Sequence, residues 1–111
     1  MKPQTEAQFM GAVIDLARSL GWKCAHFRSV RVQRKDGNSY YATPVAADGS
    51  GFPDLILAKP GCPIYFLELK VGKGKVSPAQ EEWLGLLNRA GSPALVVRPE
   101  DFDKLVRILE R

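Results

Sequence analysis

Two nearly continuous apolar segments, joined by a tight connection, constrain the fold of this 111-residue chain most strongly. Residues 53–59 and 64–70 each have the length and composition of a strand, and the sequence Pro-Gly-Cys-Pro at 60–63 favours a short turn between them. Half-solvated strands alternate apolar and polar residues, and these two do not. The pattern therefore predicts two adjacent buried strands that other elements cover on both faces.

Helix signals supply that cover. Residues 5–8 (Thr-Glu-Ala-Gln) predict a capping box that opens a first helix, which ends at Gly21. Residues 77–80 (Ser-Pro-Ala-Gln) predict a second capping box and a helix to about residue 90. Pro99 opens a last helix with acidic residues in its first turn.

Further strands are predicted over residues 22–30 and 94–98. The resulting order is helix, three strands, helix, strand, helix. It indicates an α/β fold with a central mixed sheet flanked by helices, in one domain over residues 1–111.

Residues 31–51 are polar, with a strong turn signal at Asp36-Gly37-Asn38. They predict a basic hairpin or a mobile loop that becomes ordered on a partner. The net charge of +4 and the pI near 9.3 favour a polyanionic partner, although many basic domains bind nothing charged.

Cys24 and Cys62 lack zinc-ligand spacing and are expected to be buried free thiols in a reducing compartment. No apolar run approaches the ~20 residues that span a bilayer, and the N-terminus has no signal-peptide pattern. We expect a cytoplasmic protein, or a nuclear one in a host that has a nucleus, with no membrane partner. No Walker-type phosphate loop follows a strand, so no nucleotide cofactor is expected.

Acidic residues stand where the two buried strands meet. A turn centred on Gly61 would place Asp54, at the start of one strand, directly opposite Glu68, near the end of the next. Opposed residues lie ~5 Å apart, so the two carboxylates would repel unless a divalent cation lay between them. Lys70 shares the face of Glu68 and could orient water or offset charge on a phosphate. Surface charge would explain an isolated Glu-x-Lys, but the combination predicts a metal site for phosphodiester hydrolysis. A one-residue register slip would remove the alignment.

Two further polar residues each have two interpretations. Glu6 precedes Phe9 by three positions, so it either stabilises the first turn of the helix or points at the sheet as a third metal ligand. Gln80 either completes the capping box with Ser77 or holds a water or a carboxylate at the helix entry.

Basic residues form two clusters, which are either solvated surface or DNA backbone contacts. One cluster surrounds a strand end and the following loop, and the other follows the Glu-Leu-Lys segment: Arg28, Arg31, Arg34 and Lys35, then Lys73 and Lys75. Tyr40 and Tyr41 would pack within a hairpin or stack on an unpaired base. His26 is expected in the core or on a sheet face, with a general base as the alternative. Trp22 and Trp83 are expected in the core or at a dimer interface.

The motifs together resemble the VRR-NUC domain, a branch of the PD-(D/E)XK nuclease superfamily. The resemblance rests on Glu6, Gly-Phe-Pro-Asp at 51–54, Glu-Leu-Lys at 68–70 and Ser-Pro-Ala-Gln at 77–80, and it covers nearly the whole chain. It implies a restriction-endonuclease-like core and a Mg²⁺- or Mn²⁺-dependent DNA endonuclease. By position, Asp54, Glu68, the Leu69 carbonyl and Glu6 would surround the metal, with Lys70 and Gln80 as catalytic residues.

Standalone family members of this size occur in phages and bacteria. The resemblance therefore implies a structure-selective enzyme that acts on branched DNA, such as Holliday junctions, in replication or repair. It also implies a homodimer, since two active sites could then meet two strands of a junction. The alternative is a module of the same fold that binds branched DNA without cutting it.

Overall fold

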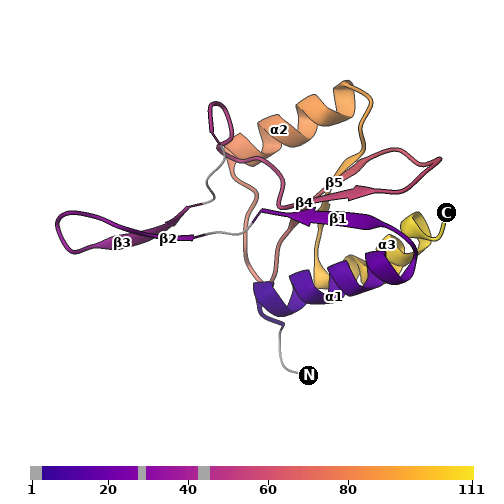
Figure 1. Cartoon of the computed structure of the whole chain (residues 1–111), viewed down its shortest axis with the longest axis horizontal. Helices are drawn as coiled ribbons and strands as arrows, with labels where there is room; N and C mark the ends of the chain where they lie inside the picture. The colour runs from indigo at the N-terminus through magenta and orange to yellow at the C-terminus, as the bar shows by residue number, and fades with distance from the viewer. Residues whose placement is uncertain (1–3, 28–29, 43–45) are drawn as a thin grey trace.

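A computed structural model describes residues 4–27, 30–42 and 46–111. Helix α1 (Glu6–Ser19) is followed by strands β1 (Lys23–His26), β2 (Val30–Gln33), β3 (Ser39–Ala42), β4 (Leu55–Ala58) and β5 (Tyr65–Leu69). Helix α2 (Pro78–Arg89), strand β6 (Ala94–Val97), a 3-10 turn (Pro99–Asp101) and helix α3 (Phe102–Leu109) complete the chain (Figure 1). None of the described helices is long and apolar enough to cross a membrane.

The central sheet has the strand order β1-β4-β5-β6, in which only the β5–β6 pair is parallel. It is the predicted mixed sheet, and it contains the four strands that the sequence predicts outside residues 31–51. Those residues instead form part of a separate two-stranded sheet of β2 and β3. The strand predicted over 22–30 is therefore shorter than expected: β1 ends at His26, and Val30 already belongs to the hairpin.

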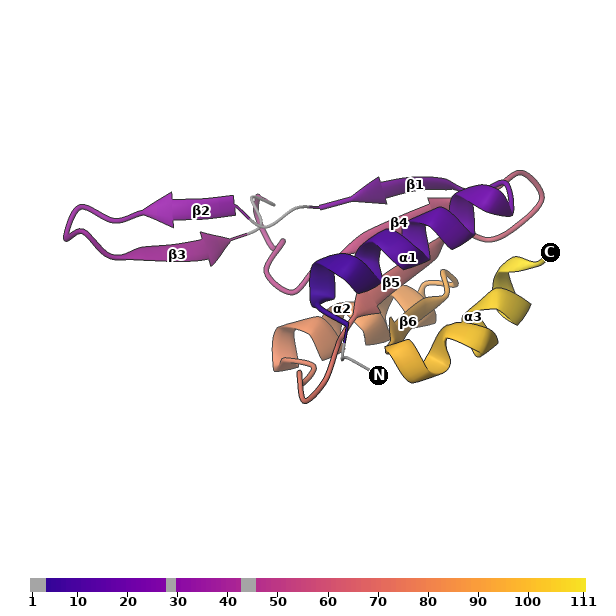
Figure 2. The ribbon, with the colours of Figure 1, turned by 90° about the horizontal axis from the view of Figure 1, so that it is seen from below.

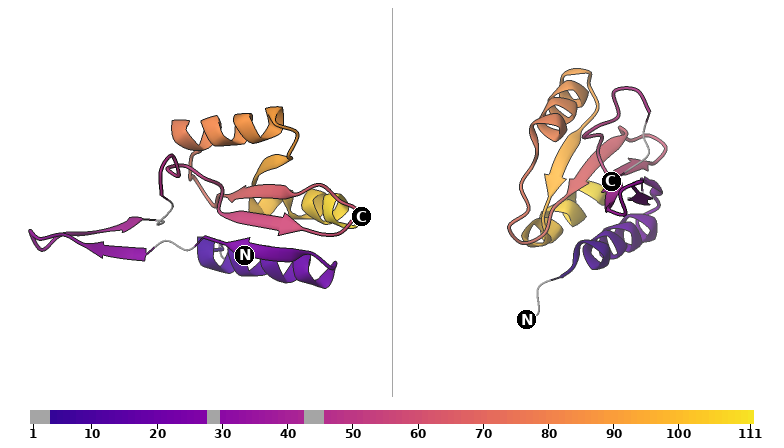
Figure 3. Two further views of the ribbon diagram at one scale, coloured as in Figure 1. Left: turned by 45° about the horizontal axis from the view of Figure 1, so that its top comes forward. Right: turned by 90° about the vertical axis from the view of Figure 1, so that its left-hand side faces the viewer.

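Helices cover both faces of the central sheet (Figure 3). On one face, α1 and α3 enclose a core with alternate residues of β4 and β5, among them Leu55, Leu57, Leu67 and Leu69. The other face carries α2 and an edge-to-face aromatic cluster in which Phe52 contacts Phe27, Phe66 and Trp83. The two buried strands thus obtain the two-sided cover that their apolar sequences predict.

The expectations for four individual residues have different outcomes. Trp22 is a core residue, and its indole nitrogen donates to the Leu109 carbonyl at 2.9 Å. Cys24 and Cys62 are free, as predicted, but only half-buried. His26 lies on a face of the sheet in the edge strand β1, which is one of its two predicted positions, and its exposed side chain excludes the other, the core.

Candidate active site

The register of β4 and β5 brings Asp54 and Glu68 together. Leu55 pairs with Leu67 and Ile56 with Phe66, so Asp54 and Glu68 are the next positions of the same ladder. The predicted register is confirmed. The Asp54 carbonyl accepts a hydrogen bond from Phe27 N at 3.0 Å, and its carboxylate Oδ2 accepts one from Leu69 N at 3.0 Å. Backbone N–H groups on both sides, from the residue after β1 and from β5, therefore fix Asp54 at the start of β4.

Glu68 is buried, with 2% of its surface exposed, on the face of the sheet that α2 covers. Its Oε2 accepts a hydrogen bond from Gln80 Nε2 at 3.1 Å and lies 3.7 Å from Lys70 Nζ. Its Oε1 is buried and has no hydrogen-bond partner among the described residues. An unsatisfied buried acceptor costs ~1–3 kcal/mol, so this oxygen is suited to a ligand that the protein does not supply.

The surroundings of Glu68 disfavour its charged form when no cation is present. Burial is the main cause. The neighbouring Asp54 carboxyl adds to it, through charge repulsion and through a hydrogen bond that forms only when one of the two carboxyls is protonated, so it gives the ionised Glu68 no donor. Lys70 opposes them, and the more distant charge of Glu6 reinforces them. Together they raise the pKa of Glu68 from 4.5 to about 8. Strongly perturbed acids of this kind cluster at functional sites, where burial and like charges shift their pKa values.

Both interpretations of Gln80 hold at the same time. Its Oε1 accepts from Ser77 N at 2.8 Å, and Ser77 Oγ accepts from Gln80 N at 3.2 Å, which completes the predicted capping box of α2. The other end of the same amide donates to Glu68. The helix cap therefore holds the Gln80 side chain in the orientation that meets the buried carboxylate.

Gly51 allows the loop that carries Asp54 to approach α2. Its φ is +82°, and a Cβ atom at this position would lie 2.5 Å from the Ala79 carbonyl carbon. Only glycine fits such a contact without displacement of the backbone. The start of the Gly-Phe-Pro-Asp segment is thereby packed against the first turn of α2, where it contacts Ala79, the residue before Gln80.

Glu6 occupies a different position from the one expected for an inward-facing ligand. Phe9 is fully buried, but Glu6 is exposed in the first turn of α1, on the helix that covers the opposite face of the sheet. Its charge still raises the pKa of Glu68, so it is within electrostatic range. Within residues 4–27, 30–42 and 46–111, no group of three or more acidic, histidine or cysteine side chains is arranged to hold a metal.

The donor set at the sheet edge nevertheless fits a hard divalent cation. Asp54 and Glu68 provide two carboxylates, and one buried oxygen of Glu68 has no partner in the described chain. Mg²⁺ typically binds one or two carboxylates and completes its shell with water and phosphate oxygens. A site of this kind does not need a third acidic side chain.

Lys70 brings a positive charge to the site, and the loop after it carries two further lysines. Lys70 is 17% exposed, and both Lys73 and Lys75 are exposed in the following loop. Arg98 donates to the Gly74 carbonyl at 2.7 Å and to the Gly72 carbonyl at 3.5 Å. Sequence reasoning missed this role of Arg98, although parallel pairing of β6 with β5 would have placed it beside Lys70.

Two residues of the other basic cluster, Arg34 and Lys35, lie in the hairpin turn, away from the carboxylates. Arg34 and Lys35 are exposed at the tip of the β2–β3 hairpin. Arg31 lies in β2 and Arg28 outside the described residues, so the placement of both side chains stays a prediction. Tyr40 and Tyr41 belong to β3, and the predictions for their side chains likewise stay untested.

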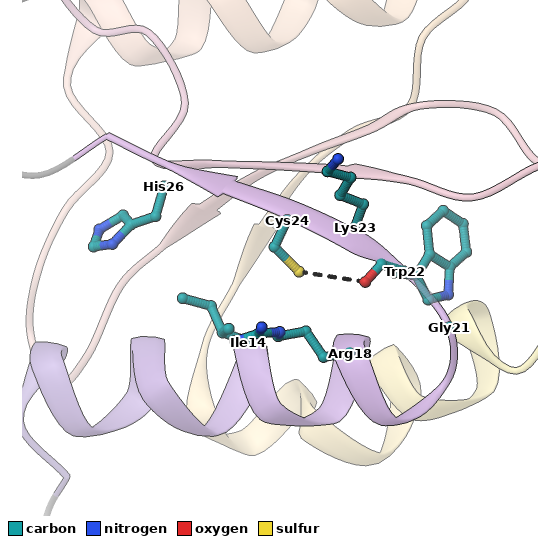
Figure 4. Close-up of a pocket in the computed structure, with 7 residues that line it drawn as sticks. All are labelled: Ile14, Arg18, Gly21, Trp22, Lys23, Cys24 and His26. Atoms are coloured by element: carbon teal, nitrogen blue, oxygen red, sulfur yellow. Dashed lines mark hydrogen bonds between the residues drawn. The ribbon is translucent and has the colours of Figure 1, made fainter.

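A hollow of about 540 Å³ lies between α1 and β1 and is separate from the carboxylate site (Figure 4). Its lining includes Ile14, Arg18, Cys24 and His26. Burial raises the pKa of the Cys24 thiol, and the nearby charge of Arg18 partly offsets the effect. The lining of the hollow includes none of Asp54, Glu68 and Lys70.

Comparison with known proteins agrees with the geometry. Searches of curated proteins and of solved structures gave no match. The VRR-NUC domain family matches residues 32–101, a range that includes Asp54, Glu68, Lys70 and Gln80. Its nucleases generally depend on divalent metals and act on DNA. Because the match covers most of the chain, this protein belongs to the VRR-NUC family and is a nuclease-type DNA-processing domain.

Proposed function

We propose that the chain, as a single domain over residues 1–111, is a Mg²⁺- or Mn²⁺-dependent DNA endonuclease. The observation that carries the proposal is the buried carboxylate of Glu68, which adjoins Asp54 and Lys70 and has one oxygen without a partner in the described structure. A stable fold gains nothing from such an atom, whereas a cation site uses it.

Asp54, Glu68 and the Leu69 carbonyl would hold the cation, and Glu6 would contribute negative charge from the first turn of α1. When bound, the cation would lower the pKa of a water ligand and polarise the scissile phosphate. Gln80 donates a hydrogen bond to Oε2 of Glu68 and so fixes the orientation of that carboxylate. Lys70, 3.7 Å from the same oxygen, would position the attacking water and offset negative charge on the phosphate.

The substrate we propose is branched DNA, including the four-way Holliday junction. The net charge of +4 and the exposed Lys73 and Lys75 beside the site support contact with a phosphate backbone. A homodimer would present two such sites to the two strands of a junction. We propose that it acts in the cytoplasm of a bacterial or phage-infected cell.

The experiment is cleavage of end-labelled hairpin, flap, splayed-arm and four-way substrates with Mg²⁺, Mn²⁺ or EDTA. We expect metal-dependent cuts that Lys70→Ala abolishes, with Lys104→Ala on the distant face of α3 as the matched control. Cleavage that persists in EDTA would contradict the metal site. Tight binding of four-way DNA without any cleavage would instead identify a non-catalytic binding module.

A further inference from the structure

The β2–β3 hairpin begins at the same edge of the sheet as the carboxylates. Strands β1 and β5 both run antiparallel to β4. The C-terminal ends of β1 and β5 therefore lie at the same end of the sheet, beside the start of β4. The chain leaves β1 there, and Phe27, the next residue, donates to the Asp54 carbonyl at 3.0 Å. Figures 1 and 2 show the hairpin projecting outward from this edge. Its base is therefore adjacent to the candidate active site, and its tip is distant.

The hairpin receives little support from the rest of the fold. Strands β2 and β3 pack extensively against each other and make no comparably extensive contact with another described helix or strand. A two-stranded hairpin alone is at best marginally stable in water. An extension of this kind is suited to a surface outside the chain.

Most of the net charge of the protein belongs to this extension. Residues 28–42 contain four basic residues and one acidic residue, a net charge of +3 compared with +4 for the whole chain. Arg34 and Lys35 are exposed at the turn, which is held by a hydrogen bond from Arg34 N to the Asn38 carbonyl at 2.7 Å. The Asp36 carboxylate also accepts from Asn38 N at 2.9 Å. The partner that this charge favours is a polyanion.

We propose that the β2–β3 hairpin is a DNA-binding arm that lies in the major groove of the duplex beside the cut, with Arg34 and Lys35 on phosphates. The proposal rests on the proposed nuclease function. It adds that tight binding needs several base pairs of duplex beside the cut. A two-stranded ribbon fits the major groove, which is ~12 Å wide. Six residues from Val30 to Lys35 reach ~20 Å at ~3.3 Å per residue. At ~3.4 Å per base pair, the tip would meet DNA about six base pairs from the scissile phosphate.

The test compares binding to branched DNA whose arms have about four or about sixteen base pairs, using catalytically inactive Lys70→Ala protein. We expect the long-arm substrate to bind at least tenfold more tightly. The double variant Arg34→Gln/Lys35→Gln should lose this preference and reduce the slope of log K against log salt by about two. The matched control, Lys104→Gln/Arg107→Gln on α3, removes the same charge and should keep the preference.

The possible outcomes distinguish a failure of the DNA-binding-arm proposal from a failure of the nuclease proposal. If the tip variant keeps the arm-length preference, or loses affinity equally for both lengths, the proposal of a groove-binding arm is overturned. If sedimentation velocity shows that the tip variant changes the oligomeric state, the hairpin contacts a second copy instead, which also overturns it. Cleavage by protein with an intact Lys70 is measured in parallel, and its absence would count against the nuclease and not against the arm.

Discussion

Gln80 and Glu68 are joined by a 3.1 Å hydrogen bond, and the same glutamine amide completes the N-terminal cap of α2. One side chain thus couples the start of a helix to a buried carboxylate of the sheet. The two roles require different chemical groups, because the cap needs an acceptor and the carboxylate needs a donor. Substitution can therefore separate them.

Gln80→Glu should keep the cap and lose the donor. Glutamate completes a capping box as well as glutamine does, but it would place another negative charge beside Glu68. We expect helix α2 to persist by circular dichroism and metal-dependent cleavage to fall at least tenfold. Ser77→Ala is the converse control: it should cost ~1 kcal/mol of stability and leave cleavage at 25 °C close to wild type. Equal activity of Gln80→Glu and wild type would show that the contact with Glu68 is dispensable.

The raised pKa of Glu68 predicts how the metal-free protein responds to pH. The folded state keeps the proton up to a pKa of about 8, compared with 4.5 for an unperturbed glutamate. The stability that this proton provides is fully present below pH 4.5, the pKa of an unperturbed glutamate, and it is lost as the pH rises through about 8, the pKa in the folded state. The free energy of unfolding should therefore decrease by up to ~1.4 kcal/mol per pH unit in this window.

Glu68→Gln should remove that decrease, because the amide does not titrate. Urea unfolding in EDTA at pH 5 and pH 8 measures the effect, and Glu110→Gln, an exposed acid on the C-terminal side of α3, serves as the control. An unchanged pH dependence in Glu68→Gln would mean that Glu68 does not hold the proton.

The sheet and the core of the site follow from local sequence signals. Two apolar strands around one turn predict the register, and the register alone brings Asp54 opposite Glu68. Capping signals locate α1 and α2 because they are local hydrogen-bond patterns. Tertiary placement is less predictable. Glu6 has the spacing of a buried stripe, yet it lies exposed in the first turn of α1. Arg98 binds backbone carbonyls 24 and 26 residues away, and carbonyls have no sequence signature.

Gly51 should be less tolerant of alanine than other glycines with positive φ. Alanine at Gly51 meets both the backbone strain of φ +82° and a contact of 2.5 Å with Ala79. Gly61 has a similar φ of +80° with nothing within 4 Å, so Gly61→Ala should cost only ~1–2 kcal/mol from backbone strain. Thermal unfolding of the two variants isolates the contact. Gly51→Ala should be clearly the less stable, and equal midpoints would show that the loop moves away from α2 without cost.

Arg98 should act on substrate affinity through the loop that it holds. Arg98→Gln removes the donors to Gly72 and Gly74 and frees the loop that carries Lys73 and Lys75. We expect KM for a DNA substrate to rise several-fold and the metal affinity to remain unchanged. Arg107→Gln, which removes an exposed charge on α3, controls for the loss of charge. A change in metal affinity would place the effect of Arg98 on the carboxylates and not on the loop.

Divalent metal should stabilise the protein through Asp54 and Glu68. A ligand at about 100 times its Kd adds ~2.7 kcal/mol to the free energy of unfolding, which would appear as a rise in thermal midpoint with Mn²⁺ or Mg²⁺. Since the cation must displace the proton on Glu68, its apparent affinity should rise by up to about tenfold per pH unit below the pKa of that group, about 8. Asp54→Asn and Glu68→Gln should abolish the metal-induced rise, and Glu6→Gln should reduce it only modestly because Glu6 is exposed. If calorimetric titrations at pH 6 and pH 7.5 gave the same affinity, or if Glu68→Gln were stabilised as strongly as wild type, the metal would be bound elsewhere on the chain.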